Sequence, residues 1–341
     1  MFWHDICGIV VHVSQMSKVT MSEFPLVAIF TPVYNGDEFL EETMESVQAQ
    51  TYPNLLHIIV NNASTDQTPE IISRYLNRKI PVLVHRNEET LPQRDNWNTA
   101  VGLVPEEARY IRLLCGDDTI TPDSIAEMVA VAETDPDIGV VGCLHDCAGA
   151  VQDFGWPQDE TIIDGIEAIR RILLGEGTLM PIQLLVRKSV ADTRQPLFQP
   201  PLGGGHDMDA MLDLLTRSKF GFVHKCLAFT RIHENSVTSL TYNAASRSWT
   251  SDAMHFMTAY GPKAFGKAYE EQLLRFRRYY VRRILRWRRE GGDEKMLSRH
   301  FEALETAGWT FGPVLIADAT ADWVFQRFGL RSNWTGYPGW Q

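Results

Sequence analysis

The chain has 341 residues, of which 44% are hydrophobic and 22% are charged, and its formal net charge is −11. Its length allows one large domain or two ordinary domains with a real core. The acidic balance argues against a nucleic-acid-binding protein, and no apolar run approaches the ~20 residues of a membrane span.

The cysteines indicate a reducing compartment. Five are present, with no Cys-x-x-Cys pair among Cys7, Cys115, Cys143, Cys147 and Cys226. Cys143 and Cys147 are too isolated for a zinc site, which needs about four ligands. No basic segment precedes the apolar stretch 6–13, which argues against a signal peptide. We therefore expect a cytoplasmic protein with reduced thiols, in which residues 1–24 are an extension ahead of the first strand.

The first third of the chain alternates strands with helices. Residues 25–31 form an apolar run of strand length, and Asp37 can cap a helix that reaches Gln50. Further strands are expected at 55–60, 80–85 and 110–116, with helices that start at Thr68-Pro69 and around Trp97. This order predicts an α/β fold with a doubly wound sheet, whose loops converge on one crevice at the carboxyl ends of the strands.

The pattern becomes mixed after Asp118. Helices are expected at 124–134, 162–174 and 207–217, strands at 138–144, 183–187 and 220–232, and a flexible loop at 203–205. Beyond about residue 241 no strand signal remains. We therefore expect a mixed sheet followed by a helical C-terminal extension.

Two adjacent carboxylates, Asp117 and Asp118, end the apolar run 110–116. Carboxylates at the carboxyl end of a sheet strand lie where open α/β sheets bind ligands. Their oxygens suit Mg²⁺ or Mn²⁺, which bind through one or two carboxylates together with substrate phosphates. The pair indicates a metal–diphosphate site, although an Asp pair before a helix is also a common cap or turn.

Short segments in a fixed order carry a resemblance to a known family. They are Thr31-Pro32-Val33-Tyr34-Asn35-Gly36, Gln48-Ala49-Gln50-Thr51-Tyr52-Pro53, Val60-Asn61-Asn62-Ala63-Ser64-Thr65-Asp66 and Cys115-Gly116-Asp117-Asp118. In combination they closely resemble family 2 glycosyltransferases of the GT-A fold. The resemblance implies a GT-A domain over residues 25–240, followed by a mainly helical region at 241–341.

The resemblance also implies roles for individual residues. The nucleotide would be held by Thr31, Pro32, Tyr34, Asn62, Arg94 and Asp117. Pro32 and Tyr34 would flank the base, and Asn62 falls where an Asp commonly accepts the base N3–H. Asp118 would be the direct ligand of Mn²⁺ or Mg²⁺.

A second group of implied roles lies further along the chain. Asp207 falls where the family carries its acidic catalytic base, with His206 in place of the usual first acid of a Glu-Asp pair. Arg231, His233 and Ser236 match an Arg-x-His-x-x-Ser ending. By resemblance, Arg231 and His206 would lie in the diphosphate and acceptor region, and His233 at the metal.

The chain departs from the family pattern at two places. Asn61-Asn62 replaces an acidic pair or an Asp-Asn, and a neutral hydrogen bond to the base would be roughly half as strong as a charge-assisted one. Cys115 stands where many relatives have another Asp, so two carboxylates remain instead of three. A UDP-sugar is the favoured donor, with GDP- and dTDP-sugars left open.

The implied reaction is inverting transfer of a sugar from a nucleotide-diphosphate donor to a hydroxyl of a saccharide or lipid-linked glycan, as in polysaccharide or cell-surface glycan biosynthesis. The metal site would neutralise the leaving diphosphate, and Asp207 would deprotonate the acceptor. Two other functions stay open. A sugar-phosphate nucleotidyltransferase would need a Gly-rich, Arg-containing loop after the first strand, and a non-catalytic sugar-nucleotide-binding protein would suit Asn61, Asn62 and Cys115.

Most of these residues also have a structural interpretation. Asp207 can be a residue at the start of a helix, where its negative charge interacts favourably with the helix dipole. Asp209 is a competing candidate for the catalytic base. His233 can be a structural histidine, Tyr34 can pack in the core, and Arg94 can form a surface ion pair.

Residues 273–289 predict a basic amphipathic helix. Its apolar residues Leu273, Phe276, Tyr280, Ile284 and Trp287 lie at helical spacing on one face. Such a helix can contact an anionic membrane, here the inner membrane face, or pack its aromatic stripe on the protein with its arginines solvated or paired. We favour packing.

Overall fold

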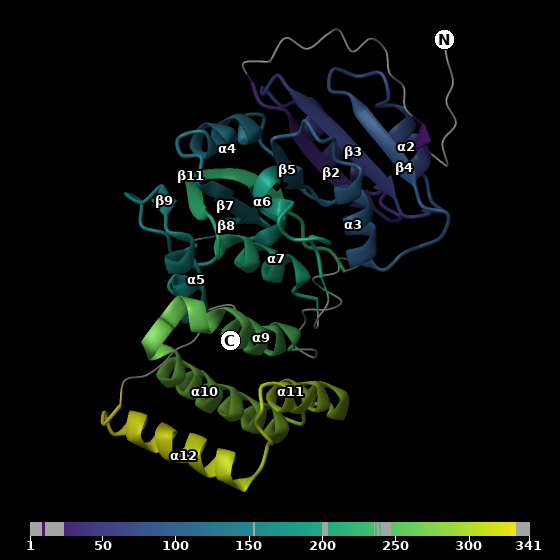
Figure 1. The fold of residues 1–341 in the computed structure, drawn as a ribbon. Coiled ribbons are helices and arrows are strands. Elements are labelled where there is room, and N and C mark those ends of the chain that lie inside the picture. Colours follow the sequence, from purple (N-terminus) through teal and green to yellow (C-terminus); the bar gives the residue numbers. More distant parts are fainter. Residues whose placement is uncertain are drawn as a thin grey trace. The chain divides into compact units, whose positions relative to one another are not determined.

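The structure, a computed structural model, describes residues 9–10, 24–152, 154–199, 204–234, 236, 239 and 247–331. Its strands are β1 (Ile9–Val10), β2 (Val27–Val33), β3 (Leu55–Asn61), β4 (Val82–Arg86), β5 (Tyr110–Leu113), β6 (Thr119–Ile120), β7 (Ile138–Cys147), β8 (Ala150–Val151), β9 (Ile162–Ile163), β10 (Leu185–Arg187) and β11 (Lys219–Thr230). They form one sheet in the order β1-β4-β3-β2-β5-β10-β7-β11-β6, with β8 paired to β7 and β9 paired to β11 (Figure 1).

The helices are α1 (Leu40–Gln48), α2 (Thr68–Ser73), α3 (Gln93–Gly102), α4 (Ser124–Ala132), α5 (Gly165–Leu174), α6 (Lys188–Ala191), α7 (His206–Leu215), α9 (Ser248–Phe265), α10 (Tyr269–Arg289), α11 (Glu294–Thr306) and α12 (Pro313–Arg327). Two short 3-10 helices, η1 (Pro181–Gln183) and η2 (Gly266–Ala268), are also present. Among the residues that the structure describes, none of the helices combines the length and apolar character that crossing a membrane requires.

The chain divides into two compact units. The first holds residues 1–163, 179–199 and 217–231, and therefore the whole sheet. The second holds residues 164–178, 200–216 and 232–341, so α5 and α7 group with the C-terminal helices. Each unit consists of several segments that are separate in the chain. The units therefore do not test the predicted domain boundary near residue 240, which stays a prediction.

The parallel half of the sheet follows the prediction. β4, β3, β2 and β5 are parallel neighbours, while β10 runs antiparallel to both β5 and β7. All seven residues of β2 are buried, as expected of a central strand covered on both faces. Helix α1 buries Leu40, Met44 and Val47, the positions that the apolar spacing predicted.

Two boundaries differ from the sequence prediction. Ile162 and Ile163 pair with β11 as a strand, and the helix expected at 162–174 begins only at Gly165. The reason is Asp164, whose carboxylate accepts hydrogen bonds from the backbone N–H of Ile166 and Glu167 and so starts the helix. The second boundary is that of the strand expected at 183–187. Gln183 is the last residue of the η1 turn, so this strand, β10, starts only at Leu185.

The N-terminal extension is described only at β1, which pairs antiparallel with β4. The other residues of the stretch 1–23, including Cys7, lie outside the described residues.

The favoured prediction for residues 273–289, that their aromatic stripe packs on the protein, is confirmed. The alternative, that this stripe contacts a membrane, is wrong. Phe276, Tyr280, Ile284 and Trp287 are all buried within the second unit. Several of the α10 arginines pair with aspartates of α12. A buried stripe has no apolar surface left to place in a lipid layer.

Candidate active site

The loops after β2 and β3 are tied to each other. The backbone N–H of Asn35 donates to Ser64 Oγ (2.9 Å), and Asn35 Oδ1 accepts from the backbone N–H of Thr65 (2.9 Å). Next along the chain, the N–H of Gly36 donates to Thr68 Oγ1 (2.9 Å). Because both strands are parallel, their carboxyl ends meet, and these bonds join the two loops into one edge.

Three predicted nucleotide residues lie at this edge or just beneath it. Thr31 is fully buried and its hydroxyl lies 2.9 Å from His57 Nε2, inside the sheet. Burial lowers the pKa of His57 to about 3, so this imidazole is neutral near pH 7. Pro32 is buried, whereas Tyr34 is 52% exposed. Of the three side chains, only that of Tyr34 is open to solvent, which counts against its interpretation as core packing.

The side chain of Asn62 holds the chain that follows β4. Its Oδ1 accepts from Asn87 Nδ2 (2.7 Å) and from the N–H of Leu91 (2.9 Å), and its Nδ2 donates to the carbonyl of Leu91 (2.9 Å). Asn87 Nδ2 also donates to Asn96 Oδ1 (2.8 Å), and all three asparagines are buried. Both lone pairs of the Asn62 oxygen are therefore used within the protein. Sequence reasoning missed Asn87 and Asn96, although Asn87 is a polar residue just past a strand end.

Arg94 forms the ion pair that its structural interpretation predicted. It lies in the first turn of α3, and its Nη2 lies 2.9 Å from the carboxylate of the adjacent Asp95. Both side chains are partly exposed. A contact with the nucleotide stays a prediction.

Three potential metal ligands converge after β5. The ligand atoms of Cys115, Asp117 and Asp118 all lie within 4.8 Å of one another. Two of the three groups are carboxylates, which suit Mg²⁺ or Mn²⁺, whereas a thiol is a softer ligand that those ions bind poorly. The set therefore fits a hard divalent ion held by two carboxylates with substrate oxygens completing its coordination.

Asp118 is almost completely buried, at 2% exposure. Its Oδ1 accepts from the backbone N–H of Arg231 (3.1 Å), and its Oδ2 accepts from Gln183 Nε2 (3.0 Å). Burial, and secondarily the neighbouring Asp117, raises the pKa of Asp118 well above its usual range. Both donors are neutral, so a cation at this point would stabilise the ionised carboxylate more than they do.

A buried arginine, Arg112, is connected to this carboxylate through Gln183. Arg112 lies within β5 and is fully buried, and its Nη1 donates to Ser124 Oγ (3.0 Å). Its Nη2 donates to Gln183 Oε1 (3.2 Å), and Gln183 Nε2 donates in turn to Asp118. The Gln183 amide thus connects a buried guanidinium to a buried carboxyl group. The signal was visible as an arginine inside the apolar run 110–116, but its partner was not.

We predict that Gln183→Met destabilises the fold by about 1–3 kcal/mol, because it leaves hydrogen-bonding groups of Arg112 and Asp118 buried without their partner. The measurement is urea unfolding followed by circular dichroism. The control is Gln67→Met at an exposed position, which should change the free energy of unfolding by less than about 0.5 kcal/mol. Equal stability of the two variants would contradict the bridging role of Gln183.

Arg231 packs across the same site. Besides its backbone bond to Asp118, its Nε donates to the carbonyl of Asp117 (3.2 Å) and its Nη2 pairs with Glu42 (2.5 Å). Its guanidinium also lies over the ring of Phe39, 4.5 Å from the centroid. Arg231 is therefore in the carboxylate site, as the sequence predicted for a diphosphate residue, but it is already paired with Glu42.

His206, Asp207 and His233 belong to the second unit. His206 is buried and Asp207 is partly exposed, both in the first turn of α7, whose N-cap is Gly205. The Asp207 carboxylate accepts from the backbone N–H of Met208 (2.7 Å). Desolvation raises the pKa of Asp207 to about 6, partly opposed by backbone hydrogen bonds. His233 is partly exposed, and its carbonyl accepts from the N–H of Ser236.

The competing base candidate, Asp209, has a structural role. It is 3% exposed, and its Oδ1 accepts from His255 Nε2 (2.8 Å) and from the Tyr260 hydroxyl (2.6 Å). Both partners belong to α9, so this carboxylate ties α7 to α9 within the second unit. Asp209 is a poor candidate for a base because its proton-accepting oxygen is already engaged.

Another aspartate, Asp252, positions the start of α7, and sequence reasoning missed it. Asp252 of α9 is fully buried, and its Oδ2 accepts from the backbone N–H of Gly205 (3.0 Å). A Cβ atom added at Gly205 would lie 2.8 Å from this oxygen and 3.0 Å from Phe256 Cζ. Only glycine allows so close an approach, and the contact determines where Asp207 lies relative to α9.

We predict that Gly205→Ala destabilises the protein by about 1–3 kcal/mol, because α7 must shift away from Asp252 to make room for the methyl group. The matched control is Gly102→Ala, since no atom lies within 4 Å of a Cβ added there near the end of α3. That variant should be neutral or more stable by up to about 1 kcal/mol. Thermal unfolding of both variants checks the pair, and a stable Gly205→Ala protein would contradict the constraint.

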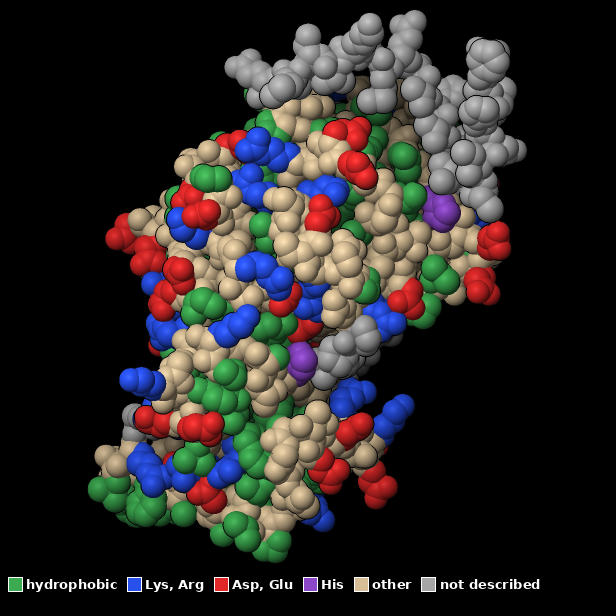
Figure 2. Space-filling view, viewed as in Figure 1, with side chains coloured by type: hydrophobic (Ala, Val, Ile, Leu, Met, Phe, Trp, Pro, Cys, Tyr) green, Lys and Arg blue, Asp and Glu red, His purple; other side chains and the backbone are tan. Residues whose placement is uncertain are grey.

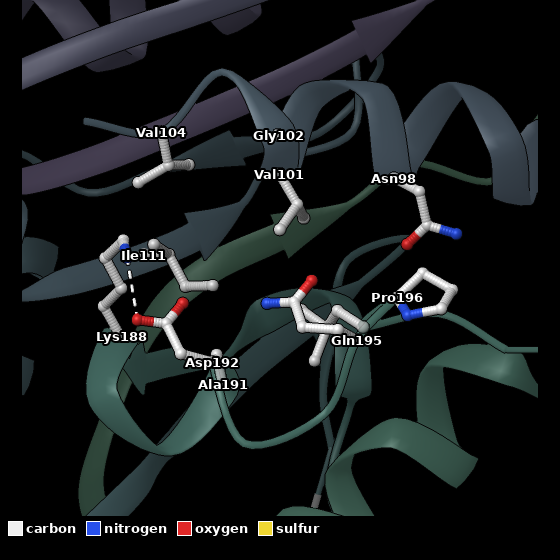
Figure 3. A pocket seen from close by; sticks show the side chains of 11 residues that line it. Asn98, Val101, Gly102, Val104, Ile111, Lys188, Ala191, Asp192, Gln195 and Pro196 are labelled. Atoms are coloured by element: carbon white, nitrogen blue, oxygen red, sulfur yellow. Dashed lines mark hydrogen bonds and ion pairs between the residues drawn. The ribbon is translucent and has the colours of Figure 1, made fainter. Parts of the chain in front are cut away.

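A cavity of about 220 Å³ lies apart from the carboxylates. Asn98 and Val101 of α3, Ile111 of β5 and the segment 188–197 line it (Figure 3). The Lys188–Asp192 ion pair (2.8 Å) closes part of its wall. None of the predicted site residues lines this cavity.

The comparisons with known proteins agree with the geometry. Residues 28–194 match the sequence profile of the family Glycosyl transferase family 2. By this match, residues 28–194 of the chain belong to this family. The protein is therefore a nucleotide-sugar-dependent glycosyltransferase of an inverting family, and the predicted resemblance is confirmed.

Among its curated relatives is a protein of Bacillus subtilis named as the teichuronic acid biosynthesis glycosyltransferase TuaG. It is 27% identical over 255 residues, which cover 69% of this chain and 92% of the relative. An uncharacterized glycosyltransferase of Rickettsia prowazekii is 26% identical over 230 residues, which cover 64% of this chain and 68% of the relative.

Solved structures show the fold. Residues 1–349 of Staphylococcus aureus TarS in complex with UDP-GlcNAc align with a TM-score of 0.61 at 16% identity, covering 82% of this chain and 79% of TarS. The mannosyltransferase PcManGT of Pyrobaculum calidifontis, in complex with GDP-Man and Mn²⁺, aligns with a TM-score of 0.55 at 14% identity, covering 90% and 81%. The predicted GT-A fold with C-terminal helices is confirmed.

Proposed function

We propose that the protein is a metal-dependent glycosyltransferase that moves a sugar from a nucleotide-diphosphate donor to a hydroxyl of a glycan acceptor, with inversion. The observation that carries this proposal is the convergence of Cys115, Asp117 and Asp118 within 4.8 Å at the carboxyl end of β5. Asp117, which is partly exposed, and the buried Asp118 would hold Mn²⁺ or Mg²⁺ with the donor diphosphate. The bound ion would supply Lewis-acid stabilisation of the leaving nucleoside diphosphate.

The chain's own residues would divide the remaining work. Gln183 and the backbone N–H of Arg231 hold the Asp118 carboxylate in one orientation. Tyr34, exposed beside the joined loops, would cover the base of the nucleotide. Asp207 would accept the proton of the acceptor hydroxyl as it attacks the anomeric carbon, for which a carboxylate with a pKa of about 6 is well suited near neutral pH.

The donor and acceptor classes follow by similarity. TarS was solved with UDP-GlcNAc and PcManGT with GDP-Man, and the name of TuaG refers to teichuronic acid biosynthesis. We propose a UDP-sugar as donor, with GDP- and dTDP-sugars as the alternatives. A saccharide or lipid-linked glycan, as used in cell-surface polysaccharide synthesis, is the proposed acceptor.

We predict that donor binding requires a divalent ion. A thermal-shift screen of UDP-, GDP- and dTDP-sugars, with Mn²⁺ or with a chelator, should show stabilisation by one donor class only when Mn²⁺ is present, because bound ligand stabilises the folded state. Asp117→Asn should lose this stabilisation.

Asp123→Asn is the control, since Asp123 lies in the same region but is exposed, and its carboxylate accepts a hydrogen bond from the hydroxyl of nearby Thr121. It should bind the donor like the wild type. Donor binding of equal strength in chelator would refute the metal site while leaving the family assignment intact.

We predict that Asp207→Asn lowers kcat by about 10²–10⁴ while donor affinity is retained, because only proton abstraction is removed. For the wild type, kcat/KM should rise with pH through about 6 and level off above it, since the carboxylate acts as a base only when deprotonated. The residual kcat/KM of Asp207→Asn should not show this rise with pH. Wild-type turnover in the variant would show that another group takes the proton.

A further inference from the structure

Helix α12 is oriented opposite to an ordinary surface helix. Its two acidic residues point toward α10: Asp322 is 4% exposed, and Asp318 lies 2.7 Å from Arg278. Most of its large apolar residues face outward, with Val314 82% and Trp323 51% exposed, and Phe328 directly after the helix is 75% exposed. A helix in water normally buries its apolar face and exposes its charges. The reversed arrangement of α12 therefore indicates a surface that water does not cover in the working protein.

Ion pairs fix this orientation. Asp318 pairs with Arg277 and Arg278, and Asp322 pairs with Arg278, Arg282 and Arg331. Turning α12 over to bury its apolar side would leave these buried and half-buried charges without partners, which is costly. The outward apolar face is thus a consequence of a specific set of contacts, with four arginines sharing two aspartates.

The exposed face of α12 is apolar along its length. Its exposed members up to Phe328 are Pro313, Val314, Ala317, Thr320, Ala321, Trp323, Val324, Phe325, Arg327 and Phe328. Arg327 is the one charged residue in this set, at the C-terminal end. Figure 2 shows hydrophobic side chains gathered over the region of α12. We call this surface the α12 face.

The surroundings of the α12 face are basic in an acidic protein. Helices α10 and α12 together contain nine arginines and four acidic residues, whereas the whole chain has a net charge of −11. The α12 face itself carries a tryptophan, Trp323. Tryptophan and tyrosine favour the boundary between lipid headgroups and acyl chains.

We propose that the α12 face is a peripheral membrane-binding surface that lies on anionic lipid. Its apolar side chains would enter the boundary between headgroups and acyl chains, and the surplus arginines of α10 and α12 would face lipid phosphates. Trp323 and Phe328 are the anchors, because they are large and 51% and 75% exposed.

Charge favours a lipid surface over a second copy of the chain. In an association of two copies through the α12 face, each would present the same excess of arginine to the other. The exposed residues of α12 include no acidic group to match it. An anionic bilayer supplies both the missing negative charge and an apolar layer.

The experiment is vesicle flotation of the full chain with two lipid compositions. Vesicles of phosphatidylglycerol and phosphatidylcholine in equal parts should carry the wild type upward, and vesicles of pure phosphatidylcholine should carry much less. Trp323→Ser with Phe328→Ser should weaken binding to the anionic vesicles by at least about tenfold, because two large apolar side chains are removed. Arg327→Gln should weaken it by about fivefold.

The matched control is Val151→Ser with Ile162→Ser, which removes two exposed apolar side chains of the sheet unit, 56% and 41% exposed. It should bind like the wild type, and all variants should unfold at similar temperatures because the altered side chains are exposed. Three results would overturn the proposal: no flotation of the wild type, equal flotation of the double variant, or sedimentation of the wild type as a dimer that the double variant abolishes.

Discussion

The hydrogen-bonded bridge from Arg112 through Gln183 to Asp118 is the constraint on which the sheet unit's carboxylate site depends. A guanidinium and a carboxylate are both buried there, and each is costly without a partner. The bridging amide satisfies a donor on one and an acceptor on the other, and the backbone N–H of Arg231 completes the carboxylate's contacts. The position of Asp118, in the loop between β5 and β6, is therefore determined by strand β5, turn η1 and the residue that follows strand β11.

The helical unit holds its candidate base by similar means. Asp209 joins α7 to α9 through His255 and Tyr260, and Asp252 of α9 accepts a hydrogen bond from the backbone at Gly205. Between these two anchors in the chain lies Asp207, whose carboxyl is desolvated and accepts hydrogen bonds from backbone N–H groups. Two of the three aspartates are thus structural, and the remaining one has the raised pKa that proton transfer near neutral pH requires.

Family motifs made part of the site predictable, because short polar segments after parallel strands must meet at one edge of the sheet. Asp117, Asp118 and Cys115 indeed lie together, and Arg231 adjoins them. Asn62 shows the limit of a motif. Its position is as expected, yet both lone pairs of its side-chain oxygen are taken by Asn87 and Leu91. Which groups share a hydrogen-bond network depends on contacts between distant segments, and local patterns do not encode these.

The sequence by itself determined the parallel strands, the order of motifs and the family, since apolar runs and turn residues are local signals. It also indicated that the stripe of Phe276, Tyr280, Ile284 and Trp287 would be buried. Only the tertiary structure decided that Gln183 joins a buried guanidinium to a buried carboxyl group, that Asp252 sets the start of α7, and that α12 turns its aspartates inward. Each of these depends on partners far apart in the chain, whose pairing is chosen by the burial of charge and not by periodicity.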